Sequence, residues 1–244
     1  MSFKKWNKVI LFGDSLTQRS LEPSEGCWGS LLADRLQRIS DVIVRGFSGY
    51  NSRWLRMISH KIFDNDFNAK EVSCLTILLG SNDSCEADCP GGQHVPIDEF
   101  EDNLSAIIGH LECIGIPRER IILISPPNYY HHMFVEYCKQ NGKNEPKKDN
   151  KTIVKYAEAM ARVAHKSGVE FIDLYKHFSN QQNSEQLFCD GLHFSRKGSQ
   201  LVFELIWPSV EKRVQLHNQC SQLTPNFPLF TDIDTKSPEK SLLP

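Results

Sequence analysis

The chain has 244 residues, and its 28 Lys and Arg residues nearly balance its 30 Asp and Glu residues. A chain of this length can bury a large core, and we expect one main domain over residues 1–216 followed by a tail over 217–244. The near-neutral charge excludes the basic surface of a nucleic-acid-binding protein and favours a small neutral or weakly charged ligand.

The apolar runs of the sequence are short. The longest, such as Cys74–Leu79 and Ile121–Ile124, fall far below the roughly 18 residues that span a bilayer, so we expect no membrane span. The N-terminal segment lacks the apolar core and the small-residue cleavage site of a signal peptide, which favours a cytoplasmic location.

The eight cysteines lie singly along the chain, and we expect reduced thiols rather than a disulfide framework. Cys85 and Cys89 could pair or bind a metal, but no second Cys or His pair stands nearby with the spacing of a zinc site. We therefore predict no metal site.

The first predicted strand is the apolar run Val9–Phe12, which ends at Gly13. Asp14, Ser15 and Thr17 follow this turn directly. Small polar side chains at such a position cap a following helix and lie near free backbone N–H groups. The turn therefore either caps a helix only or holds Ser15 where an oxyanion can be stabilised.

Short runs rich in branched side chains then alternate with apolar residues at helical spacing. The further predicted strands are Asp41–Phe47, Leu75–Leu79, Ile121–Ile124 and Val169–Ile172. The predicted helices carry the apolar faces Leu31–Leu36, Leu55–Ile62, Phe100–Leu111, Ile153–Ala164 and Leu201–Ile206. Strands that alternate with helices favour parallel βαβ units and a doubly wound α/β sheet.

Three features depart from this alternation. The segment Ser125–Asn150 is long and contains two adjacent prolines near its start, and connections of this length are often lids or binding loops. In the last helix, Pro208 is expected to kink or restart the helix. After Gln215 the apolar spacing fades into a tail to which we assign no secondary structure. Three side chains of this tail are costly to leave in water, which favours partial packing: Phe227, Leu229 and Phe230.

Polar residues follow four of the predicted strands. They are Asp14 and Ser15 after the first, Gly49 and Asn51 after the second, Asn82 and Asp83 after the third, and Asp190 and His193 in the loop after the fifth. The carboxyl ends of parallel strands meet at one edge of a sheet, where ligands of such sheets bind. We therefore expect a hydroxyl, an amide, a carboxylate and an imidazole to converge there.

These groups have complementary chemistry. A serine hydroxyl is a weak nucleophile until a base takes its proton, and imidazole titrates near neutrality, so His193 is the candidate base for Ser15. Asp190 lies three residues before it and can fix its tautomer. The candidate oxyanion donors are the N–H groups of Ser15 and Gly49 and the side-chain amide of Asn82. Each residue taken singly could also be no more than a turn or a surface position.

Two other assignments stay open. Asp173 could replace Asp190 as the orienting acid, although its place at a strand end suits a helix cap. His131 and His132, in the long segment, could replace His193 as the base.

Aromatic residues supply the candidate substrate wall. Tyr129, Tyr130 and Phe134 lie in the long segment, where such a composition suits a binding loop and a plain surface loop about equally. Trp28 and Trp54 follow the first and second strand-end turns, and they would make the acyl site small if they crowd it.

Four short blocks resemble those of the GDSL, or SGNH, hydrolases and occur in the order of that family. They are Gly13-Asp14-Ser15-Leu16, Gly46-Phe47-Ser48-Gly49, Gly80-Ser81-Asn82-Asp83 and Asp190-Gly191-Leu192-His193. The resemblance implies Ser15 as nucleophile, Gly49 and Asn82 as oxyanion-hole donors, His193 as general base and Asp190 as its partner. These are the roles that the chemistry of the residues favours.

Longer strings, such as Arg45–Trp54 and Asp190–Gly198, are similar to the isoamyl acetate-hydrolysing esterase group of that superfamily. The likeness covers about Val9–Lys212. Val44 departs from it, because relatives commonly have asparagine there. The fold implied is flavodoxin-like, a three-layer α/β/α sandwich around a five-stranded parallel sheet.

The resemblance implies a serine esterase that hydrolyses short acyl or acetate-type esters through an acyl-enzyme, with no metal or organic cofactor. Its partner would be a small-molecule ester, and the oligomeric state is left open, a homodimer included. Thioesterase, lysophospholipase or carbohydrate deacetylase activity could use the same groups. A flavin- or phosphate-binding module is a more remote alternative, because the first turn lacks a glycine-rich fingerprint. A catalytically silent binding protein is another remote alternative.

Overall fold

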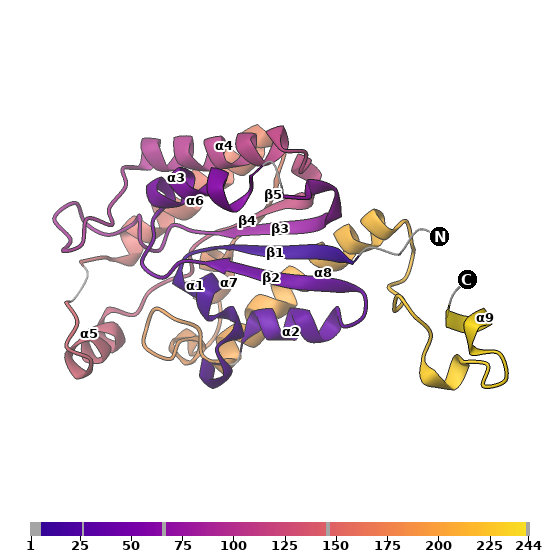
Figure 1. The fold of residues 1–244 in the computed structure, drawn as a ribbon. Coiled ribbons are helices and arrows are strands. Elements are labelled where there is room, and N and C mark those ends of the chain that lie inside the picture. Colours follow the sequence, from indigo (N-terminus) through magenta and orange to yellow (C-terminus); the bar gives the residue numbers. More distant parts are fainter. Residues whose placement is uncertain (1–5, 26, 65–66, 145–146, 243–244) are drawn as a thin grey trace.

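The protein is described by a computed structural model that covers residues 6–25, 27–64, 67–144 and 147–242. Its centre is a parallel sheet of five strands in the order β2-β1-β3-β4-β5 (Figure 1). The strands are β1 (Asn7–Gly13), β2 (Ser40–Gly46), β3 (Val72–Leu78), β4 (Ile121–Ile124) and β5 (Glu170–Ile172). This is the flavodoxin-like order, and it confirms the predicted sheet.

Helices cover both faces of the sheet. One face carries α3 (Ser52–Ile62), α4 (Ile97–Cys113) and α6 (Asn150–Ser167), and the other carries α2 (Trp28–Arg35), α7 (Leu174–Ser179) and α8 (Arg196–Asn218). Three further helices are α1 (Ser15–Gln18), α5 (His131–Gln140) and α9 (Pro238–Leu242). None of the helices in the described part of the chain is long and apolar enough to cross a bilayer.

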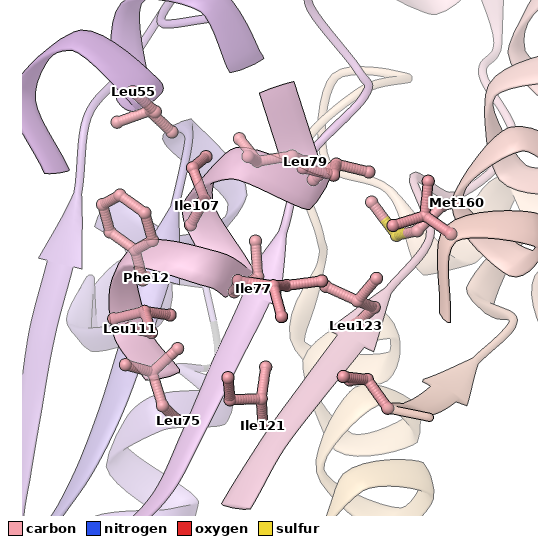
Figure 2. Packing of buried hydrophobic residues seen from close by; sticks show 14 of the residues in the cluster. Phe12, Leu55, Leu75, Ile77, Leu79, Ile107, Leu111, Ile121, Leu123 and Met160 are labelled. Atoms are coloured by element: carbon pink, nitrogen blue, oxygen red, sulfur yellow. The ribbon is translucent and has the colours of Figure 1, made fainter. Parts of the chain in front are cut away.

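Successive side chains of each central strand enter opposite cores. In β1, Ile10 and Phe12 pack toward α3, α4 and α6, whereas Val9 and Leu11 pack toward α2 and α8. Figure 2 shows the first core, where strand residues such as Phe12 and Ile77 meet helix residues such as Ile107 and Met160. Each large apolar side chain buried in this way stabilises the fold by about 1.5–3 kcal/mol, which fixes the strand ends that carry the polar residues.

Strand β3 is longer than its apolar run predicts. It begins at Val72, and the Ser73 hydroxyl within it donates to the backbone oxygen of Lys8 at 3.1 Å. This bond to the neighbouring strand satisfies the Ser73 hydroxyl. A polar residue at this position interrupts the apolar run from which the strand was predicted, so the predicted strand began too late.

The long segment 125–150 contains a helix that the sequence did not predict. In α5 only Phe134 and Cys138 are buried, and they pack in a small cluster with Tyr129, Ile153 and Leu192. A helix with so narrow a buried face gives little apolar periodicity.

Of the two effects expected at Pro208, a kink or a restart, the restart is wrong, because α8 runs through Pro208 without a break. Val202 and Ile206 before the proline, and Val210 and Val214 after it, are all buried. Their packing offsets the roughly 3 kcal/mol that proline costs in a helix interior.

The tail beyond α8 extends away from the sandwich (yellow in Figure 1). It carries a 3₁₀ turn over Phe230–Asp232 and the helix α9, neither of which was predicted. The Arg38 guanidinium ties it to the body by donating to the backbone oxygens of Phe227 and Pro228 at 2.7 Å each. The three large side chains expected to pack are 47%, 52% and 84% exposed at Phe227, Leu229 and Phe230, whereas Leu223 nearer to α8 packs against the core.

Candidate active site

Ser15 lies directly beyond the carboxyl end of β1 as the first residue of α1. Glycine is required at position 13, between the strand and the helix, because a Cβ atom there would clash with the Leu78 backbone oxygen and the Thr17 hydroxyl. Asp14 caps α1 by accepting a hydrogen bond from the Leu16 N–H at 2.9 Å. The Ser15 N–H stands in the first turn of the helix, where backbone donors have no intrahelical partner.

A chain of hydrogen bonds joins Ser15 to His193 and Asp190. The Ser15 hydroxyl lies 3.0 Å from His193 Nε2, and His193 Nδ1 lies 2.6 Å from Asp190 Oδ2. The other oxygen of Asp190 accepts from the backbone N–H groups of Leu192 and His193 at 2.9 and 2.7 Å. Gly191, at φ +87°, passes so close to the Tyr130 backbone oxygen that a Cβ atom would clash, and its turn presents the His193 ring to Ser15.

The environment of Asp190 keeps it ionised. Burial alone would raise the pKa of this carboxyl, but the hydrogen bonds from the His193 side chain and from two backbone N–H groups outweigh burial and hold the pKa below its usual range. A carboxylate in this state favours a proton on Nδ1 of His193 and leaves Nε2 as the acceptor facing Ser15.

Two further loops reach the cleft beside Ser15 and carry Gly49 and Asn82. Gly49 has φ +81°, a conformation that favours glycine, and Asn82 is buried in the turn after β3. The Asn82 side-chain amide donates one hydrogen bond to the Tyr50 backbone oxygen at 2.8 Å, and an amide nitrogen has a second N–H to offer. Ser15, Gly49, Asn82 and His193 all line one cleft of about 340 Å³.

Residues 11–201 match the family model described as GDSL-like lipase/acylhydrolase. The chain belongs to this family. A Rattus norvegicus protein named isoamyl acetate-hydrolyzing esterase 1 homolog is 38% identical over 239 residues, which cover 98% of this chain and 92% of the relative. A GDSL esterase/lipase of Arabidopsis thaliana is 35% identical over 240 residues, covering 96% of this chain and 97% of the relative.

The fold has relatives among solved structures as well. A lipase/acylhydrolase from Enterococcus faecalis superposes with a TM-score of 0.62 at 20% identity, over 91% of this chain and all of the other. The resemblance inferred from the four sequence blocks is thereby confirmed. The protein is a carboxylic ester hydrolase of the GDSL family.

Of the five aromatic residues expected at the substrate wall of this GDSL hydrolase, only Phe134 lines the cleft. Tyr129 is buried beneath α5. The Tyr130 hydroxyl bonds to Ser184, and its ring packs on Phe188.

The two tryptophans also lie away from the cleft. Trp28 is buried and donates its indole N–H to the Leu16 backbone oxygen at 3.0 Å. Trp54 packs edge-on against Tyr50, with ring centroids 5.7 Å apart. Four of the five predicted wall residues therefore lie outside this cleft, although Trp28 lines a small cavity beside His193. Aromatic side chains near a site are also the residues that core packing recruits.

The alternative acid and bases have other partners. Asp173 caps α7 by accepting from the Lys176 N–H at 3.0 Å, and it accepts from the Ser125 hydroxyl at 3.3 Å. His131 contacts the Tyr129 hydroxyl at 3.4 Å, and His132 lies 4.0 Å from Glu185. The geometry thus favours Asp190 and His193 over these residues.

Sequence reasoning missed several cleft residues, among them Gln93 and Lys148. Gln93 stands in a Gly- and Pro-rich loop, and Lys148 stands in a run of charged residues that is usually solvated. Lys148 is instead only 5% exposed, and its ammonium group donates to the Ser81 backbone oxygen at 2.7 Å. No sequence signal available in a single chain distinguishes such a lysine from its exposed neighbours.

The family blocks also carry two buried carboxyl groups outside the hydrogen-bond chain. Burial raises the pKa of Asp14 to about 7 and that of Asp83 to about 6. One oxygen of each has no hydrogen-bond partner within the described part of the chain.

The cysteines considered for a metal site are both buried free thiols, Cys85 and Cys89. Across residues 6–25, 27–64, 67–144 and 147–242, no group of three or more His, Cys, Asp or Glu side chains is placed to hold a metal ion.

Proposed function

We propose that this GDSL hydrolase cleaves short-chain acyl esters, acetate esters above all, through an acyl-enzyme on Ser15. The observation that carries the proposal is the chain of two short contacts that joins the Ser15 hydroxyl through His193 to Asp190. A hydroxyl, an imidazole and a carboxylate in this order form the arrangement that activates a serine nucleophile.

In the first half of the reaction, His193 Nε2 takes the Ser15 proton as Oγ attacks the ester carbonyl carbon. The carbonyl electrons move to oxygen, and the negative charge formed there is stabilised by the N–H groups of Ser15 and Gly49 and by the Asn82 amide. When the carbonyl re-forms, the bond to the alcohol oxygen breaks and His193 returns its proton to that oxygen. The products are an alcohol and an acyl ester of Ser15.

In the second half, a water molecule takes the place of the alcohol. His193 removes a proton from the water, which attacks the acyl carbon, and the same donors stabilise the second oxyanion. Collapse breaks the bond to Ser15 Oγ, which regains a proton from His193, and the carboxylic acid leaves. Asp190 stays ionised throughout and stabilises the imidazolium in each half-reaction.

The space around Ser15 favours a short acyl group. The cleft of about 340 Å³ lies at the lower end of the range for ligand pockets. On the side of His193 that faces Trp28 lies a cavity of about 10 Å³, which is too small for an alkyl chain. The Rattus norvegicus relative is named an isoamyl acetate-hydrolyzing esterase 1 homolog, which supports the same acyl class.

A substrate panel with a Ser15→Ala variant tests this function. Acetate, butyrate and octanoate esters of 4-nitrophenol, together with an acetyl thioester, a lysophospholipid and an acetylated sugar, separate the acyl-transfer activities that share the same groups. We expect acetate to be preferred over octanoate by at least about tenfold, and Ser15→Ala to lose at least about a thousandfold in kcat/KM. Activity retained by Ser15→Ala would end the proposal, and a preference for octanoate or the lysophospholipid would overturn its substrate class.

A further inference from the structure

Gln93 connects the two loops that supply the oxyanion donors. Its side-chain nitrogen donates to the Gly49 backbone oxygen at 2.7 Å and to the Asn82 side-chain oxygen at 3.4 Å. Gly49 lies in the loop after β2, whereas Asn82 and Gln93 lie near the start and near the end of the same long loop between β3 and α4. All three residues line the cleft beside Ser15.

We propose that Gln93 is a positioning residue that holds the Gly49 and Asn82 donors in place to receive the oxyanion. This inference rests on the proposed function, and it adds a role that none of the four family blocks contains. Gln93 does not itself need to touch the reacting atoms, because an amide nitrogen has two N–H groups and both have acceptors here.

The hydrogen bonds of Asn82 explain why a donor is needed at Gln93. The Tyr50 backbone oxygen can only accept, so it selects the nitrogen of the Asn82 amide. The Gln93 nitrogen can only donate, so it selects the oxygen of the same amide. Together they fix one orientation of Asn82, in which the second N–H of its nitrogen is available to the cleft.

Gly49 needs a similar restraint. Its φ of +81° and its lack of a side chain leave its backbone with few intrinsic limits. The hydrogen bond from Gln93 to its carbonyl oxygen holds the peptide plane next to the donor N–H. A donor whose position varies by about 1 Å costs an enzyme on the order of a hundredfold in rate.

The segment that carries Gln93 is itself anchored. The Asn51 side chain donates to the Gln93 backbone oxygen at 2.9 Å, and His94 Nδ1 lies 2.6 Å from the Cys85 backbone oxygen. The Val95 N–H donates to the Asp83 backbone oxygen at 3.2 Å, and the Tyr156 hydroxyl donates to the Val95 oxygen. Bonds at three consecutive residues limit the movement of the Gln93 side chain.

Gln93→Met tests the proposal, because methionine has a similar length but cannot donate. Gln200→Met is the matched control. Gln200 is exposed on α8, and its side chain donates a hydrogen bond to Glu204 on the same helix. For a 4-nitrophenyl acetate assay we expect Gln93→Met to lower kcat by about 10- to 100-fold with KM within about twofold. We expect Gln200→Met to match the wild type, and both variants to keep its Tm within a few degrees.

A transition-state analogue separates positioning from general damage. A trifluoromethyl ketone adds to a serine hydroxyl and forms an oxyanion, so its Ki should rise in Gln93→Met by the factor by which kcat/KM falls. In an Asn82→Ala background, Gln93→Met should cost much less than in the wild type, since one of its two targets is gone. If Gln93→Met does not fold, Gln93→Glu, which has the same shape, replaces it and should show at least the same loss.

The outcomes distinguish the two proposals. Wild-type activity that survives Ser15→Ala overturns the proposed function and the role of Gln93 with it. If Ser15→Ala is inactive but Gln93→Met keeps the wild-type kcat, raises KM alone, or costs the same factor with and without Asn82, only the role of Gln93 is wrong.

Discussion

Two kinds of buried carboxyl group lie at the same edge of the sheet, and their pKa values are shifted in opposite directions. Asp190 has an imidazole on one oxygen and two backbone N–H groups on the other, and its pKa lies below the usual range. Asp14 has a single backbone N–H on one oxygen and no partner for the other in the described residues, and its pKa is raised to about 7. The hydrogen-bond donors that surround a buried carboxyl group therefore decide whether burial or the donors set the direction of its pKa shift.

Asp83 follows the pattern of Asp14. One of its oxygens accepts from the Ser52 N–H at 2.8 Å, and burial raises its pKa to about 6. The positive charge of Lys148 lowers the pKa of both Asp14 and Asp83 but does not outweigh burial. The site thus combines one acid with a lowered pKa, hydrogen-bonded to His193, with two acids whose pKa values are raised toward neutral pH.

The largest effect is expected from removing the ionised acid. Asp190→Asn replaces the acceptor of the His193 Nδ1 proton with a group that can donate, which favours the wrong tautomer. We expect kcat for acetate esters to fall by about 10³- to 10⁴-fold with little change in KM, measured by steady-state kinetics. A variant within tenfold of the wild type would mean that Asp190 does not orient His193.

The second effect is a pH dependence of stability that comes from Asp14. Its pKa is higher in the folded protein than in the unfolded chain, so folding disfavours ionisation, and stability falls as pH rises from about 4 to about 7. Asparagine cannot ionise, so Asp14→Asn should reduce the fall in the free energy of unfolding as the pH rises. Between pH 5 and pH 8 we expect the wild type to lose roughly 2–4 kcal/mol relative to the variant.

Urea unfolding of both proteins at the two pH values measures this difference. Asp190→Asn is a useful control, because a carboxyl group with a lowered pKa contributes stability above its unfolded pKa and loses it only at acidic pH. Parallel stability curves for wild type and Asp14→Asn would show that Asp14 ionises in the folded state as easily as in water.

The smallest effect is expected at Asp173, the acid that the sequence offered as an alternative to Asp190. Asn caps helices about as well as Asp, so Asp173→Asn should keep the cap on α7. We expect kcat within about threefold of the wild type and the free energy of unfolding within about 0.5 kcal/mol. A loss of activity as large as that of Asp190→Asn would reverse the assignment.

The sequence alone predicted the sheet and the convergence of Ser15, Gly49, Asn82 and His193, because both depend on local signals. Short apolar strands that end in glycine set the sheet, and the polar residues that follow each strand must meet at its carboxyl edge. His193 could be placed next to Ser15 despite the distance along the chain, since sheet topology brings their loops together.

Features that depend on the packing of particular side chains could not be predicted. The role of Gln93 arises only when the end of the loop between β3 and α4 folds back onto Asn82, near the start of that loop, and onto Gly49. The direction of an aromatic side chain, into the cleft for Phe134 and into the core for Trp28, is decided by neighbours from other segments. Likewise, the burial of Lys148 and the exposure of Phe230 depend on which other segments pack against each of them.

Labelling of the serine tests the central claim most directly. A fluorophosphonate reacts with a serine hydroxyl that a neighbouring base has activated, and mass spectrometry locates the adduct. We expect one adduct, on Ser15, whose rate of formation falls by at least about a hundredfold in His193→Ala. An adduct on another residue, or labelling of Ser15 at an unchanged rate without His193, would contradict the account.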